Sequence, residues 1–259
     1  MIICAYQFPV SANINENCDS IRKGITSAAK QSARLLIFPE CALTGYPTSD
    51  HVMLQRIDFE TVGDALREFD LLSKQYQMYI VCGSIEKTEN GYYNSAILLS
   101  PDAPARTLYR KRALWGWDKD HFLPGKEEPG VVEIDGFRIG IRICFEIRFP
   151  EYFRELYLQN VDCVAILFCD QSEEDDLNRY ELIRSHIRTR AVENTYALVS
   201  VNSCGLYQTA PSMAVDEDGK VISELLRNEE SLLVFDLKKQ KDNSFGAQGR
   251  KYISDRLLR

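Results

Sequence analysis

The sequence predicts an α/β fold, and three observations support that class. Short apolar segments with the spacing of strands alternate with longer segments of helical spacing throughout the 259 residues. Residues 161–168 are apolar on both faces, as expected for a central strand of a parallel sheet. The chain contains no repeat, no low-complexity segment and no long Gly/Ser-rich or Pro-rich linker, so we expect residues 1–259 to form a single domain.

The first half of the chain is expected to contain five strands and two helices. In residues 14–32 an apolar residue recurs every three or four positions, which indicates an amphipathic helix. The short apolar segment 34–38 ends at Pro39, which cannot continue a central strand. The elements expected here are strands at 2–7, 34–38, 79–84, 93–99 and 106–110 and helices at 14–32 and 60–77.

The second half begins with a clear alternation. Residues 137–144 place isoleucines on one face and Arg, Gly and Cys on the other, which is typical of a strand. Pro150 is well placed to open a helix, because the first helical position tolerates proline. The elements that follow are expected at 161–168 (strand), 174–194 (helix), 197–202, 211–215 and 231–236 (strands). The polar tail 240–259 is expected to be either disordered or docked on a partner subunit.

Composition excludes several classes of function. Lys and Arg total 31 and Asp and Glu total 38, so the net charge is −7, which argues against nucleic-acid or anionic-membrane binding. The longest apolar segments are far shorter than the roughly 20 residues of a membrane helix. The start lacks the basic segment of a secretory signal, so the eight cysteines are expected to be reduced thiols in the cytoplasm. With three histidines and no paired Cys-x-x-Cys clusters, we expect no metal site.

Three polar residues follow predicted strands at the point where each strand ends. Glu40 follows RLLIFP, Lys111 follows TLYR, and Cys144 ends FRIGIRI just before a predicted helix. In open α/β sheets ligands bind at this edge, and a strand-to-helix turn can expose a nucleophile. A nearby helix N-terminus is expected to lower the pKa of the Cys144 thiol. Each residue has an ordinary alternative: Cys144 as a core residue, Glu40 as a loop carboxylate, and Lys111 as part of a solvated basic run.

At these positions the chain resembles the carbon–nitrogen hydrolase (nitrilase) superfamily. The matching segments occur in the family's order and cover the chain from residue 1 to about 236. They are IFPECALTGYP (37–47), YRKRALW (109–115), FLPG (122–125), GIRICFEIRFPE (140–151), RTRAVEN (188–194) and VNSCG (201–205). The resemblance implies a four-layer α-β-β-α sandwich forming one carbon–nitrogen hydrolase domain that commonly pairs into homodimers. It also implies a catalytic triad of Glu40, Lys111 and Cys144.

The chemistry implied by the resemblance is thiol catalysis. Cys144 would attack the carbonyl carbon of a C–N compound, and Glu40 would take the thiol proton and pass it to the leaving nitrogen. Lys111 and the backbone N–H of Phe145 would stabilise the oxyanion, and the charge of Lys111 would favour the thiolate. Water would then hydrolyse the thioester. No metal or cofactor has a role in this scheme.

Two acidic residues depart from or extend the family pattern. Asp118 stands where the family usually has a second Glu, six residues before the Pro of FLPG, and its side chain is one methylene shorter. It is expected to orient Lys111 or the substrate, or else only to cap a turn. Glu146 matches an acidic position of the family. It is expected either to contact the substrate or, in the interpretation that we prefer, to have a structural role.

The walls of the substrate pocket are less well determined. After strand 161–168 many relatives carry a Pro-Ala-Asn-Trp-like segment, whereas this chain has FCDQSEEDD. We expect the backbone at Cys169 and Asp170 to line the pocket still, with Asp170 altering which substrate is accepted. Tyr46 and Trp115 are candidate aromatic walls, although aromatic residues at such positions are as often part of the core.

The leading hypothesis is an amidase-type hydrolase of small linear amides or N-carbamoyl compounds. The CFE sequence after the strand resembles the amidase and carbamoylase branches, whereas nitrilases more often have Trp where this chain has Phe145. Nitrile hydrolysis by the same triad is therefore the second hypothesis. A third, from another class, is a catalytically idle family member that acts as an interaction module, although all three triad residue types are present.

Overall fold

A computed structural model describes residues 1–126, 129–205, 207–239 and 244–258 of the chain. It contains two six-stranded mixed sheets. The first sheet has the order β12 (Ser231–Asp236), β1 (Ile2–Gln7), β2 (Leu35–Ile37), β3 (Tyr79–Thr88), β4 (Gly91–Leu99), β5 (Arg106–Arg110). The second has the order β11 (Val221–Glu224), β10 (Met213–Val215), β9 (Ala197–Asn202), β8 (Cys163–Phe168), β7 (Phe137–Ile143), β6 (Val131–Ile134).

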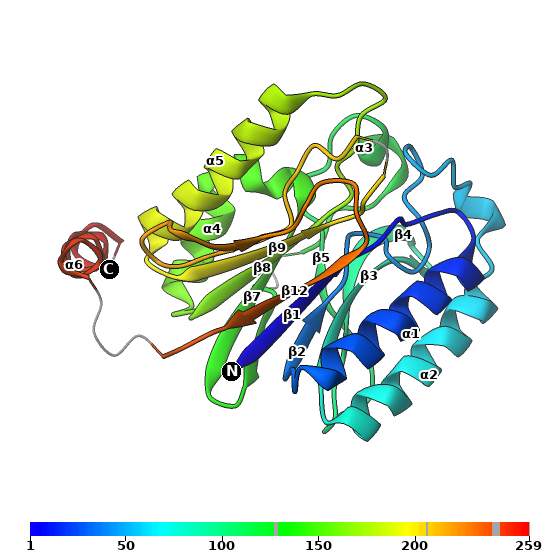
Figure 1. The fold of residues 1–259 in the computed structure, drawn as a ribbon. Helices are drawn as coiled ribbons and strands as arrows, with labels where there is room; N and C mark the ends of the chain where they lie inside the picture. The colour runs from blue at the N-terminus through cyan, green and yellow to red at the C-terminus, as the bar shows by residue number, and fades with distance from the viewer. Residues whose placement is uncertain (127–128, 206, 240–243, 259) are drawn as a thin grey trace.

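The sheets and helices form four layers, which confirms the expected α-β-β-α sandwich (Figure 1). The inner faces of the two sheets meet in one apolar core, to which alternate residues of strands such as β1 and β7 contribute. Helices α1 (Ile14–Lys30) and α2 (Phe59–Tyr76) cover the outer face of the first sheet. Helices α4 (Pro150–Leu158) and α5 (Leu177–Asn194) cover the outer face of the second.

The parallel strands set the position of the candidate residues. Strands β1, β2 and β3 run parallel to one another in the first sheet, and β7, β8 and β9 do so in the second. At the end of the second set, Ile143 pairs with Leu167, and Leu167 pairs with Val201. The segments that follow these strands therefore leave the sheet at a common edge, where ligands bind in such folds.

The structure adds elements that the sequence analysis did not predict. Strand β6 pairs with β7 through a turn at Asp135 and Gly136, both of which have positive φ as a tight hairpin turn requires. Strand β11 is a second short addition at the opposite end of the same sheet. Three short helical segments, η1 (Leu54–Arg56), α3 (Trp117–His121) and η2 (Cys144–Arg148), lie in loops. Helix α5 begins three residues later than expected, because Asp176 caps it by accepting from the Arg179 N–H.

The end of the chain is helical rather than disordered. Residues Phe245–Leu258 form α6, so the disordered alternative is wrong for this segment. The helix contacts its own chain: Tyr157 donates to Asp255 at 2.8 Å, and Arg250 pairs with Asp218 at 2.6 Å. Residues 240–243 and 259 of the expected tail lie outside the described residues, and docking on a partner subunit stays a prediction. Within the described ranges, no helix has the length and apolar character needed to cross a membrane.

Candidate active site

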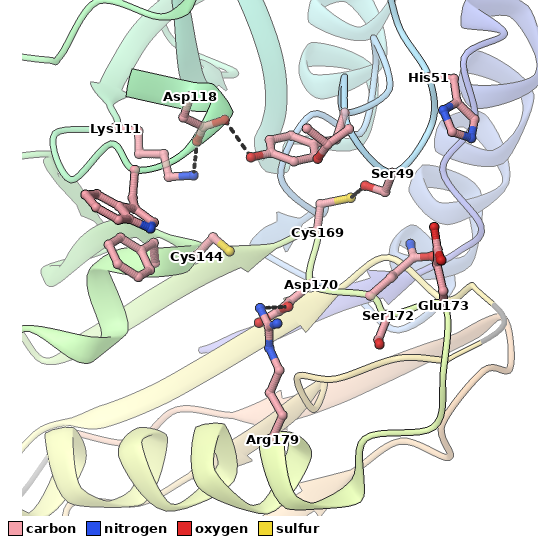
Figure 2. A pocket seen from close by; sticks show the side chains of 15 residues that line it. Ser49, His51, Lys111, Asp118, Cys144, Cys169, Asp170, Ser172, Glu173 and Arg179 are labelled. Atoms are coloured by element: carbon pink, nitrogen blue, oxygen red, sulfur yellow. Dashed lines mark hydrogen bonds and ion pairs between the residues drawn. The ribbon is translucent and has the colours of Figure 1, made fainter. Parts of the chain in front are cut away.

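Glu40, Lys111 and Cys144 meet at one edge of the sandwich. Glu40 lies in the turn after β2, Lys111 directly follows β5, and Cys144 directly follows β7. Lys111 and Cys144 line a cavity of about 470 Å³, and Glu40 lies behind them with 1% of its side chain exposed. Figure 2 shows the Lys111 ammonium and the Cys144 thiol on the same side of this cavity. The sequence prediction that these three residues converge is thus met by the geometry.

The backbone around Glu40 joins the two sheets. The Glu40 N–H donates to the carbonyl of Phe168 at 3.2 Å, and the Cys169 N–H donates to Glu40 Oε2 at 2.9 Å. Gly83 of β3 packs directly under this turn, and a Cβ there would lie 2.1 Å from the carbonyl oxygen of Pro39. Only glycine therefore permits the close approach that seats the Glu40 carboxylate between the sheets.

Lys111 lies between two carboxylates. Its Nζ lies 2.9 Å from Glu40 Oε1 and 2.7 Å from Asp118 Oδ2. The side-chain amide of Asn94, in β4, donates to the same Glu40 oxygen at 2.7 Å, and the backbone carbonyl of Asn94 accepts from the backbone N–H of Lys111. Burial alone would lower the pKa of Lys111, but the charges of Glu40 and Asp118 outweigh burial and raise that pKa well above its usual value. Lys111 is therefore a fixed positive charge beside the cavity.

Cys144 begins the η2 turn in a strained conformation. Its backbone φ is +45°, a left-handed value that residues other than glycine rarely adopt. Such strained backbone conformations often occur at functional sites. Burial raises the pKa of its thiol well above the usual value, and the Glu40 charge and a hydrogen bond to Glu40 add to this effect. Lys111 acts in the opposite direction but does not prevail. The expected lowering of this pKa is therefore wrong, and the resting thiol is neutral and depends on a base.

Asp118 contacts the lysine rather than only capping a turn. It lies in the first turn of α3 and is 3% exposed. Its second oxygen accepts from the Tyr46 hydroxyl at 2.6 Å, and the Tyr46 ring lies 5.7 Å from the Lys111 ammonium. Tyr46 and Asp118 both line the cavity, so the predicted aromatic wall at Tyr46 is present and helps to hold the carboxylate.

Glu146 connects the two segments that carry Lys111 and Cys144. Its Oε1 accepts from the Tyr109 hydroxyl at 2.7 Å and from the Arg112 N–H at 2.8 Å. Its Oε2 accepts from the Ile143 N–H at 2.8 Å. The side chain is fully buried and does not line the cavity. These contacts favour the structural interpretation over contact with substrate.

The remaining predicted wall residues also line the cavity. Trp115 lies at its surface with 71% exposure, and Phe145, Cys169 and Asp170 lie deeper. Arg179 was not predicted from the sequence as a site residue; its Nη2 lies 2.5 Å from Asp170 Oδ1, although it is nine residues away on α5. Further lining residues that were not predicted lie in loops: Thr48, Ser49, His51, Gln171, Ser172 and Glu173.

Comparisons with known proteins agree with this geometry. Residues 3–241 match the family model described as carbon-nitrogen hydrolase. An (R)-stereoselective amidase from Pseudomonas sp. is 31% identical over 201 residues, which cover 75% of this chain and 70% of that protein. A 2-oxoglutaramate amidase from Bacillus subtilis is 27% identical over 88% of this chain and 87% of its own length. The crystal structure of an amidase from Nesterenkonia sp. superposes with a TM-score of 0.81 at 24% identity, covering 100% of this chain and 96% of that one.

Proposed function

The chain belongs to the carbon-nitrogen hydrolase family, in its amidase branch, and is a hydrolase of C–N bonds other than peptide bonds; on that premise we propose its substrates and mechanism. The substrates are small linear amides or N-carbamoyl compounds, cleaved through a thioester on Cys144. The observation that carries this proposal is the convergence of a carboxylate, an ammonium and a thiol at one cavity, with Lys111 Nζ 2.9 Å from Glu40 and the thiol hydrogen-bonded to Glu40.

The first half of the reaction forms the thioester. Because the thiol is neutral, Glu40 takes its proton as the sulfur of Cys144 bonds to the carbonyl carbon. The negative charge that develops on the carbonyl oxygen is stabilised by Lys111 and by the backbone N–H of Phe145. An oxyanion donor of this kind typically contributes about 3–4 kcal/mol. Glu40 then gives the proton to the nitrogen, the C–N bond breaks, and ammonia or an amine leaves.

The second half regenerates the enzyme. Glu40 takes a proton from a water molecule, whose oxygen attacks the thioester carbon. The C–S bond breaks, the acid product leaves, and Glu40 returns the proton to the sulfur. Asp118 acts as a positioning residue in both halves, because its carboxylate holds the Lys111 ammonium together with Glu40. Glu146 positions the segments on either side of the cavity through backbone hydrogen bonds.

Amides are favoured over nitriles by Phe145, which follows the nucleophile where nitrilases more often have tryptophan. The cavity of about 470 Å³ is within the usual range for small-molecule sites and has room for a short linear substrate.

Assembly and location belong to the same proposal. We expect a homodimer, because α5 and α6 expose apolar side chains such as Leu182, Tyr252 and Leu257 that a partner subunit would cover. Light scattering of the purified chain tests this, and a monomeric mass across the micromolar range would contradict it. The eight free cysteines suit a reducing compartment, and we propose the cytoplasm.

The decisive experiment measures ammonia release from a panel of linear amides, N-carbamoyl amino acids and nitriles. We expect the amides or carbamoyl compounds to be hydrolysed and Cys144→Ala to abolish turnover. Cys163→Ala is the matched control, because Cys163 is a buried cysteine of β8 that does not line the cavity. Exclusive turnover of nitriles would favour the second hypothesis. Full activity in Cys144→Ala would overturn the mechanism, and an inert wild type with a uniformly unreactive set of thiols would indicate an idle interaction module.

A further inference from the structure

Asn94 places a polar side chain on the apolar inner face of β4. Alternate residues of a strand share a face, and the next members of this face, Ala96 and Leu98, belong to the core between the two sheets. Asn94 is 1% exposed and does not line the cavity. A polar side chain in such a place requires a specific partner, because a buried polar group without one opposes folding.

The partner of this side chain is the base of the proposed reaction. Asn94 Nδ2 donates to Glu40 Oε1 at 2.7 Å, while Asn94 Oδ1 is buried and accepts no hydrogen bond from the residues that the structure describes. Turning the amide over would set Oδ1 against the carboxylate with no proton between two acceptors, so the bond to Glu40 fixes its orientation. An unpaired buried acceptor is costly, and the bond to Glu40 is what offsets that cost.

The Glu40 carboxylate is held by a short, well-fixed donor on each oxygen. Oε1 accepts from Asn94, which belongs to β4 of the first sheet. Oε2 accepts from the backbone N–H of Cys169, which follows β8 of the second sheet, at 2.9 Å. Lys111 also donates to Oε1, at 2.9 Å, but through a flexible four-carbon side chain. Asn94 and the Cys169 backbone therefore set the plane of the carboxylate, and Lys111 adjusts to it.

The donors also distinguish the two oxygens of Glu40. Each carboxylate oxygen has two lone pairs. Both lone pairs of Oε1 have a donor, from Lys111 and Asn94, whereas Oε2 has a donor for only one, from Cys169. The Cys144 thiol also hydrogen-bonds to Glu40. The free position on Oε2 can take the proton of this thiol without breaking another hydrogen bond.

We infer that Asn94 is a positioning residue that makes Oε2 of Glu40 the atom that carries the proton in both halves of the reaction. In the first half the S–H bond of Cys144 breaks, its proton bonds to Oε2, and the electron pair of the sulfur forms the C–S bond. The proton then passes from Oε2 to the leaving nitrogen. In the second half a proton of the attacking water bonds to Oε2 and returns to the sulfur. This inference rests on the proposed function, because it concerns the base of that reaction.

The test is Asn94→Leu, which replaces the amide by an apolar group of similar size. Without the Asn94 donor the carboxylate can turn and Oε1 competes for the proton, so kcat for ammonia release should fall by about 10- to 100-fold, the usual size of a hydrogen bond to a charged group. KM should change by less than about twofold, because Asn94 does not line the cavity. The backbone carbonyl at position 94, which accepts from the Lys111 N–H, is unchanged by the substitution.

The matched control is Ser95→Ala in the same strand. Ser95 is fully buried, and its hydroxyl donates to a carboxylate outside the cavity, Glu86 Oε2, at 2.9 Å. This variant loses the same kind of hydrogen bond and should keep the wild-type kcat and KM. If Asn94→Leu does not fold, Asn94→Val removes the same donor with a smaller side chain that suits a strand, and the same fall in kcat is expected.

Combination with Glu40→Gln shows whether Asn94 acts through Glu40. A positioning residue has little left to position once the base is gone, so adding Asn94→Leu to Glu40→Gln should lower kcat by less than about twofold. A further fall of about tenfold in the double variant would mean that Asn94 acts on its own, which overturns the inference. A wild-type kcat in Asn94→Leu, or an equal fall in Ser95→Ala, would overturn it too and would leave amide hydrolysis intact.

A separate measurement applies if the wild type hydrolyses no amide, which would contradict the proposed function. Alkylation of Cys144 by iodoacetamide, followed by mass spectrometry, also requires the neutral thiol to lose its proton but needs no substrate. The rate at Cys144 should fall by at least about tenfold in Asn94→Leu and stay at the wild-type value in Ser95→Ala. Equal rates in the two variants would overturn the role of Asn94.

Discussion

Two ion pairs face the cavity from opposite sheets, and they differ in how they are built. The Lys111–Glu40 pair, from segments after β5 and β2, is 3% and 1% exposed and is joined by Asp118 and Asn94. The Arg179–Asp170 pair, from α5 and the segment after β8, combines a buried carboxylate with a guanidinium that is 43% exposed. We call the first set the buried network, which consists of Lys111, Glu40, Asp118 and Asn94. We call Arg179 and Asp170 the open pair, because solvent reaches the guanidinium.

The difference has a simple physical consequence. A buried charge whose partner is removed cannot be solvated, so the loss of one member is costly to the fold. A half-exposed charge recovers most of its hydration when its partner is lost, so the same change costs little. We therefore expect substitutions in the buried network to affect both chemistry and stability, and substitutions at the open pair to affect substrate choice.

The largest effect is expected for Glu40→Gln. The single oxygen of the amide can still accept from Lys111 and Asn94, and only the hydrogen bond from the Cys169 N–H is lost, but the amide cannot take the proton of a thiol whose pKa is raised. General-base catalysis contributes about 10²- to 10⁴-fold, and kcat for ammonia release should fall by that factor. A variant with more than a tenth of the wild-type kcat would show that another group carries the proton.

The next effect is on stability. Lys111→Met leaves two buried carboxylates without their cation, and removing one member of a buried pair typically costs about 3–5 kcal/mol. For a chain of this size we expect Tm to fall by roughly 10 °C or more in thermal unfolding followed by circular dichroism. Asp170→Asn is the corresponding change at the open pair, because it leaves only the half-exposed Arg179 without its partner, and it should cost about 1 kcal/mol or less. Equal losses in the two variants would remove the distinction between the pairs.

Alkaline pH tests whether water is excluded equally from the turn at Glu40 and from the cavity wall at Cys169. Burial raises the pKa of Cys41, which follows Glu40 and does not line the cavity, and the pKa of Cys169, which does line it, well above the usual thiol value. In the unfolded chain each thiol ionises near pH 8.5, while the folded thiol stays neutral. Each thiol therefore contributes stability that is complete below about pH 8.5 and is lost as pH rises further, by about 1.4 kcal/mol per pH unit.

The measurement is the free energy of urea unfolding between pH 8 and 10 for the wild type and for two variants. The unfolding free energy should fall with rising pH, and Cys41→Ala and Cys169→Ala should each make that fall less steep by the contribution of one thiol. A slope changed by Cys41→Ala but not by Cys169→Ala would mean that water reaches the wall built by the second sheet.

The sequence predicted the buried network better than the open pair, for a physical reason. Glu40, Lys111 and Cys144 each follow a strand within a few residues, and strand ends can be inferred from alternation and from Pro39. Arg179 reaches Asp170 only because the loop between them folds back, and loop conformation is not encoded in a periodic pattern. The same holds for the loop residues Ser49 and His51 in the cavity wall.

Burial by residues that are far apart in the sequence explains other differences between the sequence predictions and the structure. A helix end and the Lys111 charge near Cys144 predict a lowered thiol pKa, but burial and the Glu40 carboxylate outweigh them in the folded chain. Asn94, which lies beside Ser95 in the largely apolar strand 93–99, is a further sequence signal of this network. Helix α6 was missed because it contains two glycines and lacks a clear apolar face.

The smallest expected effect tests whether the stability cost of a substitution depends on the burial of the residue or on the sheet from which its segment comes. Trp115 lies four residues after Lys111, on the segment that follows the first sheet, yet it is 71% exposed at the cavity surface. If burial determines the cost of substitution, Trp115→Ala should change stability by less than about 0.5 kcal/mol and Tm by no more than about 2 °C. If the whole segment after β5 is one rigid unit, the loss of Tm in Trp115→Ala should instead approach the loss of Tm in Lys111→Met. Thermal unfolding of the two variants side by side distinguishes these outcomes, because the substitutions lie in the same segment and differ mainly in exposure.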